Sequence, residues 1–340
     1  MDPDQDWKRA VAPYAQANTR RAMIDLATSV LPYIALCVVM YLTLDVSIWL
    51  TLALAIPTGG FLLRTFIVFH DCGHGSFLPS KAANRWVGRF TALLVWQTYA
   101  NWRHDHAVHH GTAGDLDRRG QGDVPTWTVD EYYERPWHSR LGYRLFRNPV
   151  VMFGLGPIWS LMVGPRLSSL EKRKRLRNSI TLTTLTLAAA ITAYVLLLGW
   201  KAFLLIEILP AFLAGFAGVW LFYVQHQFED VYWESTERWS YADAALQGSS
   251  YLKLPQPLQF FTGNIGLHHV HHLDAKVPNY NLQRAHDEVE IFHDVPVLTL
   301  GESVKCVRLK LIDTDTGRLV TWAEARQIAQ RSPSRVAATA

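Results

Sequence analysis

Residues 26–63 read LATSVLPYIALCVVMYLTLDVSIWLTLALAIPTGGFLL, and Asp45 is the only charged side chain in that run. A helix needs roughly 20 mostly apolar residues to cross the hydrocarbon core of a bilayer. The run therefore has room for two crossings separated by Asp45, and the second continues as a helix to about residue 68. Arg64 lies where its long side chain is expected to snorkel. This pattern predicts a helical hairpin in a membrane.

A second hairpin is predicted further along the chain. Residues 178–200 contain no charged side chain, and residues 202–226 contain only Glu207. The Gly199-Trp200-Lys201 segment between them is suited to a turn. We therefore expect an all-α polytopic membrane protein whose four transmembrane helices form two hairpins. The predicted spans are about 26–44, 46–68, 178–200 and 202–226, within a single domain that covers residues 1–340.

The composition agrees with a membrane protein. Of the 340 residues, 49% are hydrophobic and 18% are charged, whereas an ordinary soluble domain is about a quarter charged. A net charge of +4 without a highly charged tail gives no reason to expect a nucleic-acid partner. The three cysteines are too few and too widely spaced for a disulfide scaffold or a zinc ribbon.

Basic residues predict the orientation of the spans, because cytoplasmic loops carry an excess of Lys and Arg. They precede the first and third spans, whereas the two hairpin turns together contain only Lys201. The N-terminus, the middle segment and the C-terminal third are therefore expected in the cytoplasm. The basic residues are Lys8, Arg9, Arg20 and Arg21 before the first span, and Arg166, Lys172, Arg173, Lys174, Arg175 and Arg177 before the third.

The remaining residues are assigned to a cytoplasmic helical cap, 70–177 and 227–295, and to a C-terminal tail, 296–340, whose last ten residues are expected to fray. Two apolar runs inside the cap complicate this topology. Phe90–Trp102 is too short to span a bilayer, and Asn148–Pro165 is interrupted by Pro and Gly and flanked by arginines. We predict that both runs are interfacial or buried half-helices.

Eleven of the 14 histidines fall in four places, each at or just past the cytoplasmic end of a predicted membrane segment. The first place reads HDCGH at 70–74, so two imidazoles lie about one helical turn apart. HAVHH at 106–110 and HHVHH at 268–272 each present histidines at i, i+3 and i+4, which face one side of a helix. His104 precedes the second place, and His226 stands alone at the end of the fourth span.

So many imidazoles facing one another favour a metal site, because a neutral imidazole is a good ligand for zinc, copper, iron and nickel. A structural zinc site closes with four ligands, whereas this pattern supplies enough for two metals with open positions. An open site of two metals beside a lipid phase points to redox iron. The predicted ligands are His70, His74, His106, His109, His110, His226, His268, His271 and His272. His138, His286 and His293 are isolated and interpreted as ordinary residues.

The order of HDCGH, HAVHH and HHVHH around a second apolar hairpin resembles the membrane fatty acid desaturases. FYVQHQFED at 222–230, GNIGLHHVHHL at 263–273 and VPNY at 277–280 are similar to the acyl-lipid branch of that family, found in bacteria, cyanobacteria and plants. The resemblance covers about residues 20–295. It implies a stem of four spans and a cytoplasmic cap that holds two iron ions on the nine histidines above.

The resemblance also suggests residues that support the ligands. Asp71 is a candidate for orienting a ligand imidazole, as are Glu229 and Asp230, with a place among the surface acids as the alternative for all three. Asn264 is a candidate for holding an open metal position through water, with capping of the helix at 268–272 as the alternative. His104 and His269 do not fit the i, i+3, i+4 geometry, so we expect them beside the ligands or on the surface.

The chemistry that the resemblance implies is formation of a cis double bond in a lipid-linked acyl chain, with O2 as co-substrate. Two electrons must come from a separate carrier of the ferredoxin, flavodoxin or cytochrome b5 type, because the sequence contains no Gly-rich nucleotide-binding loop. The basic segments Arg140–Arg147 and Arg166–Arg177 are candidates for docking such a carrier, and lipid headgroups are the simpler explanation for them.

Two alternatives stay open from the sequence. Enzymes with the same histidine pattern hydroxylate or ketolate fatty acyl, sphingolipid or carotenoid chains, and a small positional change separates these outcomes. A metal transporter would place ionisable residues along a path through the membrane, and the predicted spans contain only Glu207. The transporter is therefore the more remote alternative.

Overall fold

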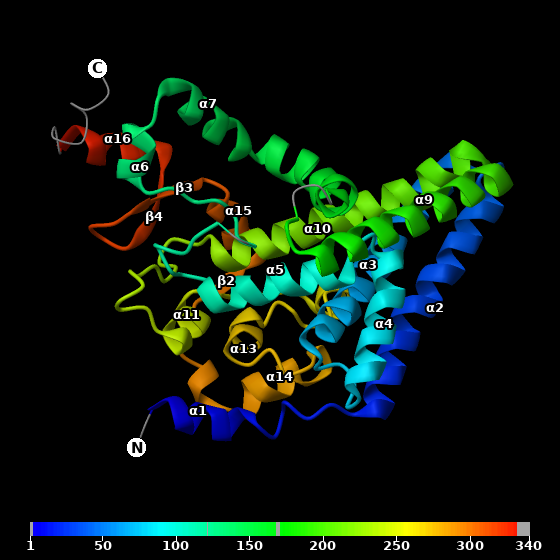
Figure 1. The fold of residues 1–340 in the computed structure, drawn as a ribbon, viewed down its shortest axis with the longest axis horizontal. Coiled ribbons are helices and arrows are strands. Elements are labelled where there is room, and N and C mark those ends of the chain that lie inside the picture. The colour runs from blue at the N-terminus through cyan, green and yellow to red at the C-terminus, as the bar shows by residue number, and fades with distance from the viewer. Residues whose placement is uncertain (1–2, 121, 168–170, 332–340) are drawn as a thin grey trace.

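The computed structural model describes residues 3–120, 122–167 and 171–331, and it is mostly helical (Figure 1). The helices are α1 Pro3–Val11, α2 Thr19–Thr43, α3 Ile48–His74, α4 Lys81–Leu94, α5 Tyr99–Thr112, α6 Val129–Glu134, α7 Trp137–Phe146, η1 Val151–Leu155, α8 Gly156–Ile158, η2 Trp159–Val163, η3 Gly164–Arg166, α9 Lys174–Ala202, η5 Phe203–Ile208, α10 Leu209–His226, α11 Tyr241–Gln247, α12 Gln256–Phe261, α13 His268–Leu273, α14 Asn279–Glu288, η6 Glu290–Phe292, α15 Leu300–Cys306 and α16 Trp322–Arg331. The strands are β1 Tyr251–Lys253, β2 Val297–Thr299, β3 Leu309–Asp313 and β4 Arg318–Thr321.

The first predicted hairpin is present as α2 and α3. Side-chain caps begin both helices: Asn18 accepts from the third residue of α2 and Ser47 from that of α3. Gly75 ends α3 in the left-handed region, at φ 68°, which a side chain would disfavour. The helix therefore runs unbroken from the turn near Asp45 to the end of the HDCGH motif.

The second hairpin is formed by α9, η5 and α10, which together make a continuous helical run of 53 residues. Gly199 interrupts that run with φ 85° and ψ 164°. The rings of Tyr194 and Phe203 lie 6.0 Å apart, whereas nine residues of straight helix would separate them by about 13 Å. The chain therefore reverses direction at this glycine.

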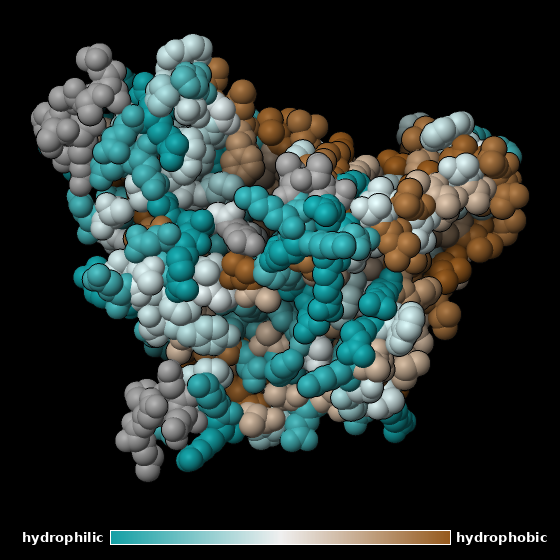
Figure 2. Space-filling model, in the orientation of Figure 1, coloured by the Kyte–Doolittle hydropathy of each residue, from teal (hydrophilic) through white to brown (hydrophobic). Residues whose placement is uncertain are grey.

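Within the described residues, three helical runs are long and apolar enough to cross a membrane: α2, α3 and 174–226. The Lys201 ammonium lies 2.9 Å from an Asp45 carboxylate oxygen, so the turns of the two hairpins meet. They form the upper right corner of the molecule (Figure 1), where hydrophobic side chains dominate the visible surface (Figure 2). The opposite ends of α3 and α10 carry His74 and His226 and face the polar part of the molecule.

The two complicating apolar runs are helical in part. Phe90–Trp102 contains the end of α4 and the start of α5, separated by a bend at Trp96, whose φ is 56°. Residues 151–166 form short, irregular helical segments, η1 to η3, that pack on α10. A Cβ at Gly215 of α10 would lie only 2.7 Å from Leu161 Cδ1, so the absence of a side chain there allows the close approach.

The expectation of an all-α protein is wrong in one respect, because the described residues include two small sheets. Strands β1 and β2 pair in parallel, and β3 and β4 form an antiparallel hairpin whose turn contains Gly317 at φ 71°. Most of the predicted tail is therefore folded, and Cys306, Ile312 and Leu319 pack into the main core. The alternating apolar residues of LKLID and RLVT, on either side of a TDTG turn, are typical of a β-hairpin. Residues 332–340, predicted to fray, lie outside the described residues.

Two arginines do not occupy the positions expected from the sequence. Arg64 is 12% exposed and forms an ion pair with Asp25, instead of snorkelling. Arg147 is fully buried and donates to the Gln227 side chain at 2.8 Å and to the Leu309 carbonyl at 3.1 Å. Arg147 therefore joins the FYVQHQFED segment to β3, and it is not available for docking a partner.

The substitution Arg147→Ala is expected to lower the free energy of unfolding by about 2–4 kcal/mol, because buried acceptors lose their donor and a cavity remains. Thermal unfolding in detergent measures the effect. Arg318→Ala, which removes a largely exposed ion pair with Asp230, is the control and should cost less than about 1 kcal/mol. Equal losses in the two variants would contradict the structural role of Arg147.

Candidate metal centre

Four elements bring the histidines of the sequence motifs to one place. HDCGH forms the last turn of α3, and HAVHH lies on α5. HHVHH forms most of the short helix α13, and His226 ends α10. The nine predicted ligands converge, and eight of them fall into two groups of four.

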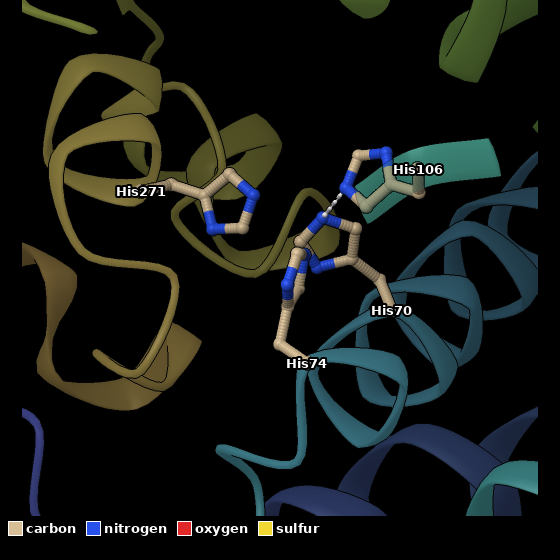
Figure 3. Close-up of side chains that lie close together, drawn as sticks. All are labelled: His70, His74, His106 and His271. Atoms are coloured by element: carbon tan, nitrogen blue, oxygen red, sulfur yellow. Dashed lines mark hydrogen bonds between the residues drawn. The ribbon is translucent and has the colours of Figure 1, made fainter. Parts of the chain in front are cut away.

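The first group consists of His70, His74, His106 and His271, and one nitrogen of each ring lies within 4.8 Å of the others. The four imidazoles come from α3, α5 and α13 and point toward one another (Figure 3). His70 Nε2 and His106 Nε2 are 3.0 Å apart. His74 and His106 are half-buried, so this group lies near the protein surface.

The second group consists of His109, His226, His268 and His272, with the same 4.8 Å limit between the nitrogens. His226 Nε2 lies 2.9 Å from His268 Nε2, and His109 Nε2 lies 3.2 Å from His272 Nε2. All four side chains are buried. The lone histidine at the end of the fourth span is therefore part of the cluster.

His110 lies between the two groups. Its Nε2 is 2.9 Å from His271 Nε2 of the first group, and its ring stacks at 4.2 Å on that of His272 in the second. Its Nδ1 is buried and has no hydrogen-bond partner among the described residues. One imidazole therefore contacts both candidate sites.

The chemistry of this donor set fits metal cations. Burial, followed by the neighbouring imidazoles, holds the pKa of His106, His110 and His271 well below the usual value. His268 and His272 are shifted in the same direction, since burial and then the adjacent rings lower the pKa of both side chains. Each neutral ring carries one lone pair on a ring nitrogen, and a cluster of such nitrogens about 3 Å apart is suited to binding a metal cation.

Hydrogen bonds behind three of the rings direct Nε2 toward the cluster. His70 Nδ1 donates to the Asp71 carboxylate at 3.0 Å, so Asp71 contacts a predicted ligand. His226 Nδ1 donates to the Gly248 carbonyl at 3.0 Å, and His109 Nδ1 donates to the Asp123 carboxylate. Such partners fix the tautomer of a ligand imidazole and raise its basicity. Asp123 and Gly248 belong to no motif, so their roles could not be predicted from the sequence.

Asp71 is itself held by Asn279 of the VPNY segment. The Asn279 backbone N–H donates to Asp71 Oδ2 at 2.6 Å, and its side-chain amide donates to the same oxygen at 3.0 Å. That amide also lies 3.0 Å from Asp25 Oδ2, and Asp25 pairs with Arg64. A buried polar chain thus connects the membrane hairpin to His70.

Other predicted supporting residues lie elsewhere. His104 contacts Arg173, and His269 Nε2 lies 3.1 Å from His286 Nδ1, away from both histidine groups. The Asn264 amide donates to the Asn279 carbonyl at 3.2 Å. The capping alternative for Asn264 is wrong, because α13 has no side-chain cap. Its suggested role at a metal remains a prediction.

Glu229 and Asp230, which were candidates for orienting a ligand, are both exposed. Asp230 Oδ1 forms an ion pair with Arg318 at 2.8 Å. The Glu229 backbone carbonyl accepts from Leu319 of β4. Asp230 is therefore a surface acid, which is the alternative considered from the sequence.

A cavity of about 850 Å³ adjoins the histidines and lies between α3, α10, the start of α5 and residues 151–165. His70, His106 and His268 line it, so it reaches both groups. From Gln225 to Ala211 it follows α10 for about 20 Å, at the rise of an α-helix. Most of its wall is apolar, so it suits a long apolar ligand.

Comparison with known proteins agrees with this arrangement. The model of the family described as "Fatty acid desaturase" matches residues 47–295, which include all nine histidines. The chain belongs to the fatty acid desaturase family. It is therefore an oxidoreductase, and its histidine clusters are compatible with a diiron site.

Individual desaturases are similar over much of the chain. A "Fatty acid desaturase" of Bacillus subtilis is 44% identical over 320 residues, which are 94% of this chain and 91% of that protein. An "sn-1 oleoyl-lipid 12-desaturase" of Synechocystis is 30% identical over 68% of this chain and 66% of its own length. An "sn-1 acyl-lipid omega-3 desaturase (ferredoxin)" of the same organism is 27% identical over 66% of this chain and 63% of its own length.

The substitution Asp123→Ala is expected to weaken metal binding at the second group by about 10–100-fold, because His109 loses the carboxylate that orients it. Iron retained by the purified desaturase after dialysis against graded chelator concentrations measures this loss. Asp230→Ala removes a surface carboxylate and is the matched control. Equal iron retention in wild type and Asp123→Ala would show that Asp123 does not support a ligand.

Proposed function

We propose that this chain introduces a cis double bond into an acyl chain of a membrane lipid. The observation that carries the proposal is the contact between a long apolar cavity and both histidine groups. For each double bond, two hydrogens leave adjacent methylene carbons, and O2, two electrons and two protons yield two waters. O2 is the oxidant, and iron held by the histidines would activate it, because no amino-acid side chain can remove hydrogen from an unactivated methylene.

The proposed ligands are His70, His74, His106 and His271 at one iron and His109, His226, His268 and His272 at the other, with His110 between them. Asp71, Asp123 and the Gly248 carbonyl hold three of these rings in the ligating tautomer. Pre-oriented ligands keep both metals beside the cavity while the substrate enters and leaves.

The cavity wall would hold the reacting methylenes and exclude water. Leu63, Phe66 and Ile67 of α3 face the cavity on one side, and Ala214 and Gly218 of α10 on another. Small residues on α10 leave room for an unbranched chain along the helix. A dry site of this kind prevents water from consuming the oxidising equivalents.

We further propose four membrane crossings, because the 53-residue run is divided by the reversal at Gly199. Basic residues before α2 and around the start of α9 favour a cytoplasmic position for the N-terminus and the histidine groups. A separate one-electron carrier would then deliver electrons from the cytoplasm. A relative is named as a ferredoxin enzyme, so ferredoxin is the first carrier to test.

The substitutions His109→Ala and His271→Ala should each abolish desaturation, because each removes a proposed ligand from a different iron. Fatty acids from a host that expresses each variant are identified by gas chromatography and mass spectrometry. His138→Ala, which changes an exposed histidine on α7, is the control and should retain full activity.

Three outcomes would contradict the proposed function. Activity retained in both ligand variants would refute the ligand assignment. Hydroxy or keto products from the wild type would assign the chain to the other reaction considered from the sequence. No new product from wild-type protein that holds iron and is supplied with reduced ferredoxin and lipid would exclude desaturation of that lipid.

Substitution of Gly218 tests the cavity as the acyl site. A Cβ built at Gly218 has Leu63 Cδ1, at 3.8 Å, as its single neighbour within 4 Å among the described residues. Gly218→Leu should therefore fill the cavity and lower kcat/KM for the longest accepted chain by about tenfold or more relative to a shorter chain. Ala217→Leu, at a neighbouring position outside the cavity lining, is the control. An unchanged chain-length profile in Gly218→Leu would exclude this cavity.

A further inference from the structure

The two histidine groups differ in their distance from the surface, and this difference bears on how electrons reach them. All members of the second group are buried, whereas His74 and His106 of the first are half-buried. The Trp102 ring stacks on His106 at 4.4 Å and lies 5.5 Å from the His70 ring. Trp102 is itself partly exposed. Trp102 and His106 line the cavity, whereas His74 is half-buried and does not line it, so the first group is exposed outside the cavity at His74.

The surface beside that group is basic. Lys81 and Arg85 of α4, Arg103 of α5 and Lys276 after α13 are all exposed, and together they are called the basic face. The Lys276 ammonium donates to the His74 carbonyl at 2.6 Å. Arg103 directly follows Trp102 in the chain. Figure 2 shows hydrophilic residues gathered over α5 and α4.

Packing of α4 against α3 and α5 brings Lys81 and Arg85 close to the first histidine group. The Tyr99 hydroxyl donates to the Cys72 carbonyl at 2.7 Å, which ties the start of α5 to HDCGH. Gly88 of α4 lies against both residues, because a Cβ there would be 2.2 Å from the Tyr99 ring and 3.0 Å from Cys72 Cβ. Bulk at Gly88 would push α4 and its cations away from the histidines.

The cations act on one another electrostatically. Burial lowers the pKa of Lys276, and the positive charges of Arg103 and Lys81 lower it further, while Asp274 opposes them. Helix α4 contains no acidic residue, from Lys81 to Leu94. The basic face thus keeps a positive potential despite the nearby Asp274.

We infer that the basic face docks an acidic one-electron carrier and that electrons enter the metal centre through the group of His70, His74, His106 and His271. This inference rests on the proposed function, which requires two electrons from outside the chain for each double bond. Each docking event transfers one electron from the reduced carrier to the metal centre, so two carriers are oxidised per turnover. A positive face attracts an acidic partner and aligns it for transfer.

The basic segments at 140–147 and 166–177 are less suitable. Arg147 is buried, Arg166 donates to the Trp96 carbonyl, and Arg173 pairs with Glu171. These three arginines have structural partners. Exposed cations remain in the second segment, but the contact of Lys276 with the His74 carbonyl places the basic face directly against the first histidine group.

The test uses the full chain in vesicles of neutral phosphatidylcholine, with an acidic plant-type ferredoxin as the carrier. The double variant Arg85→Glu/Arg103→Glu should raise the KM for ferredoxin by about tenfold, while kcat changes little. Its rate should depend on salt no more steeply than that of the wild type. In the wild type, the rate at low ferredoxin concentration should fall with added salt. The charge-matched control is Lys305→Glu/Arg308→Glu, which reverses two exposed cations at the end of α15, an element that lies away from α4 in Figure 1, and it should leave the KM unchanged.

A second measurement separates docking from structural damage. Product formed in a single turnover after reduction with dithionite should be equal in the double variant and the wild type, because the small reductant does not need the basic face. An unchanged KM for ferredoxin would overturn the inference, as would equal losses with ferredoxin and with dithionite. A defect confined to vesicles that contain phosphatidylglycerol would assign the face to anionic lipid instead.

The same assay distinguishes failure of this inference from failure of the proposed function. If the wild type forms no unsaturated product with dithionite or with ferredoxin, desaturation itself fails. If the wild type forms product and the charge reversals leave the KM for ferredoxin unchanged, only the docking site fails.

Discussion

The structure depends on the convergence of nine imidazoles in one place, seven of them buried and two half-buried. Their ring nitrogens approach within about 3 Å in five pairs, and burial keeps most of these rings neutral. An arrangement of this kind is unfavourable without a cation, because buried polar atoms need partners. These side chains come from four helices: α3, α5, α10 and α13. The packing of those helices must therefore keep the histidines together. Metal binding is therefore expected to contribute to the stability of the cap as well as to its chemistry.

A polar chain transmits this constraint from the cap to the membrane hairpin. Arg64 pairs with Asp25, and Asn279 contacts both Asp25 and Asp71. Asp71 in turn holds His70. Every member is buried or nearly so, and groups in such a site are costly to leave unpaired. Helix α2 is thereby tied to the orientation of one proposed ligand, although no residue of α2 lies in either histidine group.

The local spacing of residues was enough to predict the hairpins, the reversal near Gly199 and the set of nine converging histidines. Uncharged runs and i, i+3, i+4 histidines depend only on helix geometry. The sequence did not separate the histidines into two groups, because that division requires α5, α10 and α13 to pack together. Asp123 was missed for the same reason: it reaches His109 from a loop without a motif. Arg147 looked like a surface cation because its buried partners, Gln227 and Leu309, lie far away in the chain.

The proposed function requires that the two histidine groups hold two iron ions side by side. The most direct measurement is the iron and zinc content of the purified full-length chain, together with Mössbauer spectroscopy after growth on ⁵⁷Fe. The account predicts about two irons per chain, in a coupled pair with nitrogen-rich ligation. One iron per chain, or zinc in place of iron after expression with ample iron, would contradict it.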